Sequence, residues 1–273
     1  MQHILIPTDF SDNSLNAALY AMDLFVQNVH LYTVVNCYDL PAYGDSSMVD
    51  ITEHLARASR EGLDAFQLKL LNVLPNKDLR VDYESEHGRL DRVVQNYGRR
   101  ANIPELVVMG TQGATGMKAV LMGTNTADVI KHSGLPVLAI PEEARYTGLK
   151  RIVLADDGGE VDPKVLDILI QIVMHTNAEL IVTRVVNEKT KVDDPAKANG
   201  IIDALHDVPH TTVHLSGVDV MNELNEEVVR SNADLLALVH RERGVFDRLF
   251  RRSIASKLVM HSRTPMLVLQ SGT

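Results

Sequence analysis

Apolar residues along this chain alternate between short continuous runs and longer stretches of helical spacing. Residues 3–7 (H-I-L-I-P) and 29–37 (V-H-L-Y-T-V-V-N-C) are short apolar runs typical of buried strands. After each run, at residues 15–25 and 48–74, apolar positions recur three and four apart, which indicates helices that bury one face. Further strands are predicted at 81–85, 106–110 and 136–140. Apolar strands that alternate with helices predict a parallel sheet with helices on both faces.

The same pattern then begins again. The opening H-I-L-I-P-T-D returns as R-I-V-L-A-D-D at residues 151–157, and L-Y-T-V-V-N-C returns as L-I-V-T-R-V-V-N at 180–187. The run K-H-S-G-L-P-V-L-A-I near the end of the first half returns as M-H-S-R-T-P-M-L-V-L in the second. Because these echoes keep their order, we predict two tandem doubly wound α/β domains, residues 1–145 and 146–273. Each domain is expected to hold a five-stranded parallel sheet.

The first half carries a glycine-rich stretch after its fourth strand. Gly110, Gly113 and Gly116 follow that strand at a spacing of three, and Gly123 and Thr124 precede a helix. Glycines let the backbone approach a phosphate and turn its N–H groups inward, and a helix N-terminus favours negative charge. Thr124 is placed to cap the helix or to give its hydroxyl to a phosphate. The alternative is that these glycines only form tight turns.

The glycine spacing differs from both common phosphate loops, because no Lys-Ser/Thr pair follows the last glycine and the first three glycines open no helix. The spacing resembles the nucleotide loop of the universal stress protein family, Gly-x2-Gly-x9-Gly-Ser/Thr. Gly110, Gly113, Gly123 and Thr124 match that loop at every position. The resemblance covers essentially the whole chain, once per half, and implies the fold of the adenine nucleotide alpha hydrolases.

The resemblance also implies an adenine nucleotide site beyond the carboxyl ends of the strands of the first domain. ATP is expected there, with Mg²⁺ bridging its phosphates. Asp9 and the strand end around Val34 and Val35 would frame the adenosine, while the glycine loop would hold the phosphates. A helix cap is the alternative role for Asp9, and the two roles are compatible. The predicted nucleotide-binding residues are Pro7, Thr8, Asp9, Val34, Val35, Met109, Gly110, Thr111, Gly113, Gly116, Gly123, Thr124 and Asn125.

Binding with little or no turnover is the expected activity. Phosphoryl transfer needs a group that positions water and cations that stabilise the transferred phosphoryl, and near this loop the sequence offers only Gln112 and Lys118. The resemblance implies the same, because some family members bind ATP, some do not, and turnover is weak. No catalytic and no metal-binding residue is assigned. We expect a stress-response or regulatory nucleotide-binding protein; the alternatives are a slow ATP hydrolase and a pseudo-dimeric scaffold that recruits partners without a nucleotide.

The second half lacks the glycine loop. Only Gly244 survives in V-H-R-E-R-G-V-F-D-R-L-F-R-R-S, and Arg252 stands where the first half has Gly123. The preferred interpretation is that arginines of this segment fill the empty site by pairing with Asp156 or Asp157. The alternative is a second anion site made by forked guanidinium donors. The other arginines of the segment are Arg241, Arg243, Arg248 and Arg251.

Histidine and cysteine provide no stronger site. His206, His210 and His214 lie four apart, which on a helix would align metal ligands, but the T-T-V before His214 indicates a strand. Cys37 is the one cysteine of the chain, and we interpret it as a small core residue near the expected base.

Composition narrows the class of protein. The 273 residues are 45% hydrophobic and 23% charged, as in soluble globular proteins, and the net charge of −9 argues against nucleic acid as a partner. No apolar run approaches a membrane span, no signal peptide is recognisable, and a single cysteine fits a reducing, cytoplasmic setting. In the family, single domains pair through their last strands, so residues 137–140 and 266–269 are expected to pair within this chain. Association into a homodimer is left open.

Overall fold

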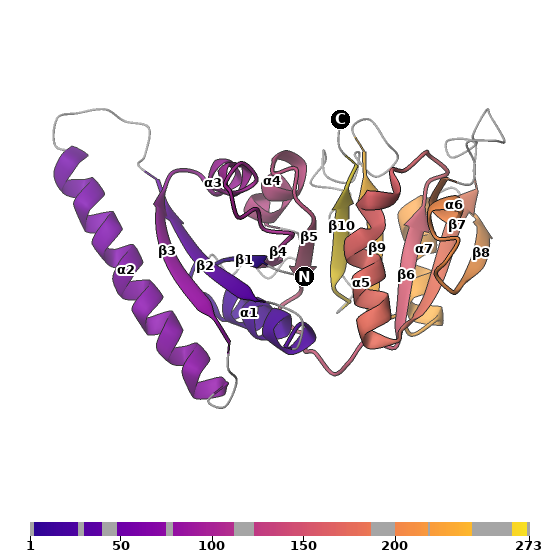
Figure 1. Ribbon diagram of the computed structural model, residues 1–273, viewed down its shortest axis with the longest axis horizontal. Helices are drawn as coiled ribbons and strands as arrows, with labels where there is room; N and C mark the ends of the chain where they lie inside the picture. Colours follow the sequence, from indigo (N-terminus) through magenta and orange to yellow (C-terminus); the bar gives the residue numbers. More distant parts are fainter. Residues whose placement is uncertain are drawn as a thin grey trace. The chain divides into compact units, whose positions relative to one another are not determined.

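The computed structural model of the protein describes residues 3–26, 30–39, 48–74, 79–111, 123–186, 200–217, 219–241 and 264–271 (Figure 1). The described chain forms two compact units. Unit 1 holds the described residues up to Glu142, and unit 2 holds those from Glu143 onward. Each unit contains five strands, and all the strand pairs within a unit are parallel.

Unit 1 alternates strands and helices throughout. Its elements are β1 (His3–Pro7), α1 (Asp12–Leu24), β2 (Leu31–Tyr38), α2 (Met48–Val73), β3 (Val81–His87), α3 (Leu90–Tyr97), β4 (Leu106–Gly110), α4 (Thr124–His132) and β5 (Val137–Ile140). β1 lies between β2 and β4, β3 pairs with β2, and β5 pairs with β4. The strand order therefore reverses between β1 and β4, and the carboxyl edge at such a point is where open α/β sheets bind ligands.

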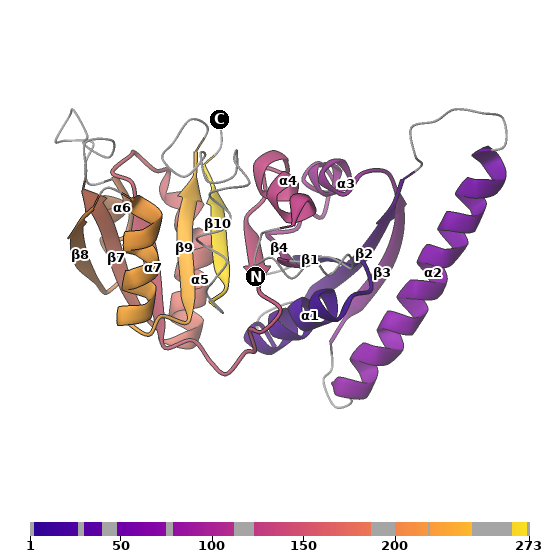
Figure 2. The ribbon, with the colours of Figure 1, turned by 180° about the vertical axis from the view of Figure 1, so that it is seen from behind.

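Helices cover both faces of the sheet of unit 1, as predicted. α1 packs against β4 and β5, and α2 packs against β2 and β3. α3 and α4 pack against each other on the opposite side of the sheet (Figures 1 and 2). Side chains of β1, β4 and β5 are buried at nearly every position, because both faces of these strands carry helices.

Unit 2 repeats the same order. Its elements are β6 (Arg151–Asp156), the 3-10 helix η1 (Pro163–Leu166), α5 (Asp167–Thr176), β7 (Glu179–Val186), α6 (Gly200–Ala204), β8 (His210–Ser216), α7 (Val220–Arg230), β9 (Leu235–His240) and β10 (Met266–Gln270). β6 lies between β7 and β9, β8 pairs with β7, and β10 pairs with β9. α5 covers one face of this sheet and α7 the other (Figures 1 and 2). His210 and His214 lie on strand β8, so the helical metal spacing does not apply to them.

The second helix is the largest difference in element length between the units. α2 has 26 residues and α6 has five, as the shorter segment between the second and third strands of the second half predicts. None of the helices in the described part of the chain has both the length and the apolar character that crossing a bilayer requires.

Candidate functional site

Hydrogen bonds join the carboxyl ends of β1 and β2. The backbone N–H of Thr8 donates to Val35 O at 2.9 Å, and Asn36 Nδ2 donates to Thr8 O at 2.7 Å. The hydroxyl of Thr8 lies 2.8 Å from Ser14 Oγ on α1 and accepts from the backbone N–H of Phe10 at 3.0 Å. The groups that these hydrogen bonds of Thr8 and Asn36 join are all neutral.

Asp9 supports the cap of α1 instead of forming it. Ser11 is the N-cap, and its hydroxyl accepts from Ser14 N at 3.2 Å. Asp9 Oδ1 accepts from Ser11 Oγ at 2.5 Å and from Ser11 N at 3.1 Å, so the carboxylate orients the hydroxyl that caps the helix. The side chain of Asp9 is exposed at the carboxyl edge of the sheet.

The start of α4 is tied to the end of β4. Gly123 N donates to Thr111 O at 2.6 Å, and Thr126 Oγ1 donates to Gly110 O at 2.9 Å. The N-cap of α4 is Gly123, and no side chain caps the helix there. The predicted cap by Thr124 is therefore wrong, because Thr124 is the first helical residue and its side chain is exposed. An N-terminus without a side-chain cap leaves N–H groups of its first turn open to an anion.

Gly110 has a packing reason to be glycine. A Cβ atom at this position would lie 2.7 Å from Asn13 Nδ2 and 2.8 Å from Asn13 Cγ, which is closer than real Cβ contacts. Asn13 is buried on α1, so its amide has little room to move away. Close packing thus accounts for Gly110 without a ligand. Gly113 and Gly116 lie outside the described residues, as do Gln112 and Lys118.

The predicted site residues that the structure describes differ in exposure. They come from the ends of β1 and β4, from the middle of β2 and from the start of α4. Pro7, Thr8, Val34, Val35, Met109 and Thr111 are buried, Gly110 and Gly123 are half-buried, and Asp9, Thr124 and Asn125 are exposed.

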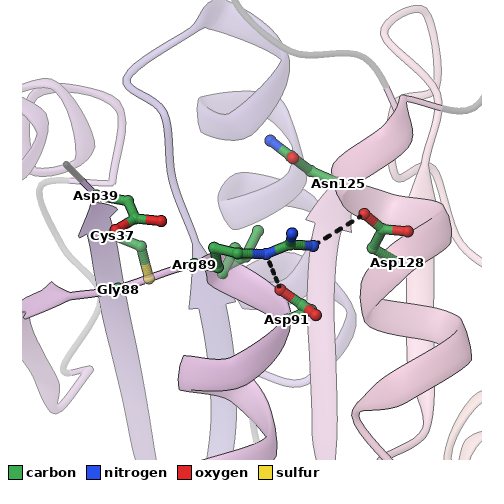
Figure 3. Close-up of a pocket in the computed structure, with 8 residues that line it drawn as sticks. Cys37, Asp39, Gly88, Arg89, Asp91, Asn125 and Asp128 are labelled. Carbon is green, nitrogen blue, oxygen red and sulfur yellow. Dashed lines mark hydrogen bonds and ion pairs between the residues drawn. The ribbon is translucent and has the colours of Figure 1, made fainter. Parts of the chain in front are cut away.

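A cavity of about 350 Å³ opens beyond the carboxyl ends of β2 and β3 and beside the starts of α3 and α4 (Figure 3). Asn125 is the one predicted site residue that lines it. Gly88, at the turn into α3, has a φ of +125°, a conformation that glycine adopts without strain. The described residues that line it are Cys37, Asp39, Gly88, Arg89, Leu90, Asp91, Asn125 and Asp128.

Arg89 joins the two helices that flank the cavity (Figure 3). Its Nε donates to Asp91 Oδ1 at 3.2 Å on α3, and its Nη2 lies 3.7 Å from Asp128 Oδ2 on α4. Asp91 is buried, and His132 Nδ1 at the end of α4 lies 3.9 Å from its second carboxylate oxygen. The flank of the cavity is therefore a connected set of charges, with the guanidinium between two carboxylates.

No pattern in the sequence singles out Arg89, Asp91 or Asp128 as a site residue. Each is an ordinary charged residue near the start of a helix, so residue type alone gives no signal. The available signal is positional: a glycine, Gly88 or Gly123, lies just before each of the two helices.

Cys37 lines the cavity as a neutral thiol. Burial, and secondarily the charge of Glu86, raises the pKa of Cys37 to about 12. A thiol with so high a pKa is a poor nucleophile near neutral pH, so this site offers no activated cysteine.

Comparison with known proteins agrees with the repeated architecture. The model of the universal stress protein family matches residues 1–141 and, a second time, residues 148–270. The chain belongs to the universal stress protein family.

Individual relatives show the same likeness. A universal stress protein of Methanocaldococcus jannaschii is 30% identical over 143 residues, which cover 50% of this chain and 80% of that protein. The crystal structure of a universal stress protein from Archaeoglobus fulgidus is similar over 99% of this chain and 96% of its own, with 17% identity and a TM-score of 0.69. A protein of unknown function from Pseudomonas aeruginosa is similar over 98% and 92%, with 11% identity and a TM-score of 0.58. The two solved structures show the shared fold.

The second unit of this universal stress protein replaces two neutral side chains by charged ones. The register of β6 against β7 matches that of β1 against β2. In unit 1, Pro7 lies opposite Val35. In unit 2, the next pair of positions along the two strands holds Asp156 opposite Arg184. Asp156 therefore takes the position of Thr8, and Arg184 takes the position of Asn36.

Ion pairs occupy this edge of unit 2. Arg184 Nε donates to Asp156 Oδ2 at 2.9 Å and its Nη2 binds the same oxygen, while the side chain of Asp156 is only 1% exposed. Arg241 binds Asp157 and donates to Glu160 O at 3.1 Å. The preferred interpretation is thus confirmed for Arg241 and Asp157. Asp156 pairs with Arg184 of β7, an arginine outside that segment. Arg243, Arg248, Arg251 and Arg252 lie outside the described residues.

Proposed function

We propose that unit 1 binds an adenine nucleotide, with the nucleoside in the cavity and the phosphates at the start of α4 and the glycine loop. The observation that carries this proposal is the cavity itself. Its volume of about 350 Å³ lies within the range of small-molecule pockets, and it reaches the first turn of α4 at the carboxyl edge of the sheet.

The charges around the cavity support this orientation of the ligand. Asp39 and Asp128 accept hydrogen bonds, which suits the exocyclic amine of adenine and the hydroxyls of ribose. The same carboxylates would repel phosphates, so the anionic end of the ligand belongs elsewhere. The first turn of α4 offers open N–H groups and the positive end of the helix dipole.

Magnesium would reach the site with the phosphates. Among the described residues there is no group of three or more His, Cys, Asp or Glu side chains placed to hold a metal. Mg²⁺ commonly keeps several waters and binds through substrate phosphates, so the site does not require such a group.

Little or no turnover belongs to the same proposal. Efficient phosphoryl transfer requires a positioned water and cations at the transferred group, for which the sequence offers only Gln112 and Lys118. The alternative is a slow ATP hydrolase. Steady release of phosphate that depends on the protein and is lost in a cavity variant would favour that alternative.

Calorimetric titration with Mg·ATP, ADP and AMP tests the binding proposal. Asn125→Trp would fill part of the cavity and is expected to weaken binding at least tenfold, or by about 1.4 kcal/mol. Lys131→Trp is the matched control, because Lys131 is exposed at the far end of the same helix. No binding of any adenine nucleotide by the wild type would contradict the proposal, and equal affinity in Asn125→Trp would contradict the placement of the nucleoside.

The same titration gives the number of sites. We propose one nucleotide per chain, because the Asp156–Arg184 pair fills the corresponding edge of unit 2. Two equivalent sites per chain would contradict the closure of the second unit.

A further inference from the structure

The outer face of α2 gathers exposed apolar side chains. Of the eight large apolar side chains that the described structure leaves exposed, four belong to this helix. They are Ile51, Leu68, Leu71 and Val73. The other face of α2 packs against β2 and β3, and the described elements of unit 1 leave the outer face uncovered. Unit 2 has no counterpart, because α6 is five residues long.

A seam of exposed residues runs along this outer face. Its members are spaced alternately three and four apart, which places them on one side of the helix as in a two-helix coiled coil. They are His54, Arg57, Glu61, Asp64, Leu68 and Leu71, and all are exposed. Charged residues occupy the middle of the seam. None of the ion pairs between described residues involves Arg57, Glu61 or Asp64.

We propose that α2 pairs in antiparallel orientation with α2 of a second copy of this chain. In the register that places Arg57 opposite Glu61 of the second copy, His54 comes opposite Asp64. Two-fold symmetry repeats both contacts, so four central layers join a basic residue or histidine to a carboxylate. In the same register Leu68 lies opposite position 50 of the second copy, one residue from Ile51, at both ends of the pair.

Charge complementarity selects this arrangement over its competitors. In a parallel pair, Arg57, Glu61 and Asp64 would each lie opposite its own copy, and like charges at such positions are destabilising. An antiparallel register shifted by one heptad in one direction sets Glu61 opposite Asp64. The shift in the other direction sets Arg57 opposite His54 and pairs fewer residues.

The pairing is expected to be weak and sensitive to salt. Exposed ion pairs contribute little each, and screening reduces them further at high ionic strength. The two copies of Arg60 also come near each other at the symmetry axis, which opposes association. We therefore expect a dimer that forms in the micromolar range at low salt and dissociates at high salt.

Sedimentation equilibrium of the whole chain tests the pairing. Arg57→Glu and Glu61→Arg each place like charges in both central layers, so each variant is expected to dimerise at least tenfold more weakly than the wild type. An equimolar mixture of the two variants restores opposite charges and is expected to form a one-to-one dimer. Single variants that dimerise like the wild type, or a mixture that stays monomeric, would overturn the proposal.

Chemical cross-linking tests the register. At 1.5 Å per residue, the two copies of position 58 lie about 3 Å apart along the helix axis, and the two copies of position 65 lie about 18 Å apart. Both alanines are exposed, so cysteine is tolerated at either position. A short bis-maleimide is expected to join Ala58→Cys into a covalent dimer and to leave Ala65→Cys monomeric, with the wild type as the control for Cys37. Equal or reversed yields would overturn the register.

Discussion

The carboxyl edges of the two sheets share a backbone and differ in charge. In unit 1, the side chain of Asn36 and the backbone of Thr8 hold β1 to β2 by neutral hydrogen bonds. In unit 2, Asp156 and Arg184 hold β6 to β7 by an ion pair at the same register positions. The side chains at these two paired positions are therefore neutral in unit 1 and form an ion pair in unit 2.

The turn after each of these strands is the same. The backbone N–H of Phe10 donates to the side chain of Thr8, and that of Gly158 donates to the side chain of Asp156 at 2.8 Å. Both turn residues have positive φ, +66° for Phe10 and +77° for Gly158. The comparison therefore isolates side-chain chemistry, because the path of the chain is shared.

The largest expected effect comes from removing one partner of the filled edge. Arg184→Met leaves the carboxylate of Asp156, 1% exposed, without its guanidinium. Breaking a buried ion pair in this way costs about 3–5 kcal/mol of unfolding free energy. Because Arg184 is 12% exposed, we expect a loss at the lower end, about 3 kcal/mol. Urea unfolding of wild type and variant measures the change in free energy.

Two variants serve as controls. Arg151→Met breaks a surface pair with Glu179, in which both side chains are about half exposed, and is expected to cost less than about 1 kcal/mol. The double variant Asp156→Thr, Arg184→Asn copies unit 1 and is expected to recover most of the loss. If Arg184→Met were no more costly than Arg151→Met, the description of a buried pair would be wrong.

The reverse exchange, which puts the charged residues of unit 2 into unit 1, tests whether this edge takes part in ligand binding. Thr8→Asp with Asn36→Arg installs the ion pair of unit 2 at the edge of unit 1. Its affinity for Mg·ATP is expected to fall at least tenfold, or by about 1.4 kcal/mol, because the guanidinium would occupy the edge. Titration calorimetry measures the affinity, and circular dichroism checks that the variant folds. Unchanged affinity would show that this edge lies off the path of the ligand.

A smaller effect is expected at the shared turn. Gly158→Ala puts a Cβ atom on a residue with a φ of +77°, which costs roughly 1–2 kcal/mol. Phe10→Gly should still destabilise unit 1, because its ring packs 6.4 Å from the ring of Phe66 and that contact outweighs the relief of backbone strain. Urea unfolding measures both variants. A neutral Gly158→Ala would mean that the turn relaxes to another conformation.

The smallest expected effect is a pH dependence of stability that arises at the start of β1. His3 is buried, its Nδ1 donates to Asn102 O at 3.2 Å, and its Nε2 accepts from Thr33 Oγ1 at 2.8 Å. Burial lowers the pKa of His3 below 6.5, so the unfolded chain binds the proton more readily. The stability that this neutral imidazole contributes is present above pH ~6.5 and is lost as the pH falls below that value.

Unfolding free energies at about pH 7.5 and about pH 5.5 measure this loss, which is expected to be below about 1 kcal/mol. His3→Gln should reduce the difference between the two pH values. Arg151, which takes the place of His3 in unit 2, does not titrate in this range. An undiminished difference in His3→Gln would assign the pH dependence to another group.

The fold follows from the sequence because local pattern and repeat agree. Apolar runs predict the strands, and the order of echoes predicts two like sheets. Arg184 could not be found in this way, because it interrupts an apolar run and its partner is known only once the strand register is known. The residue type of Phe10 does not predict its positive φ, and the residue type of Arg89 does not predict that it lines a cavity.

The filled edge also constrains the order in which such a site can evolve. An arginine at the position of Arg184 keeps 12% of its side chain in contact with solvent, so it can arrive while Thr or another neutral residue still occupies position 156. An aspartate that arrived first at position 156 would be a buried charge without a partner, at a cost comparable with a large share of the stability of a domain. The arginine is therefore expected to be gained first and lost last. We expect relatives with the arginine alone to be more common than relatives with the aspartate alone, which a comparison of family sequences at these two positions tests.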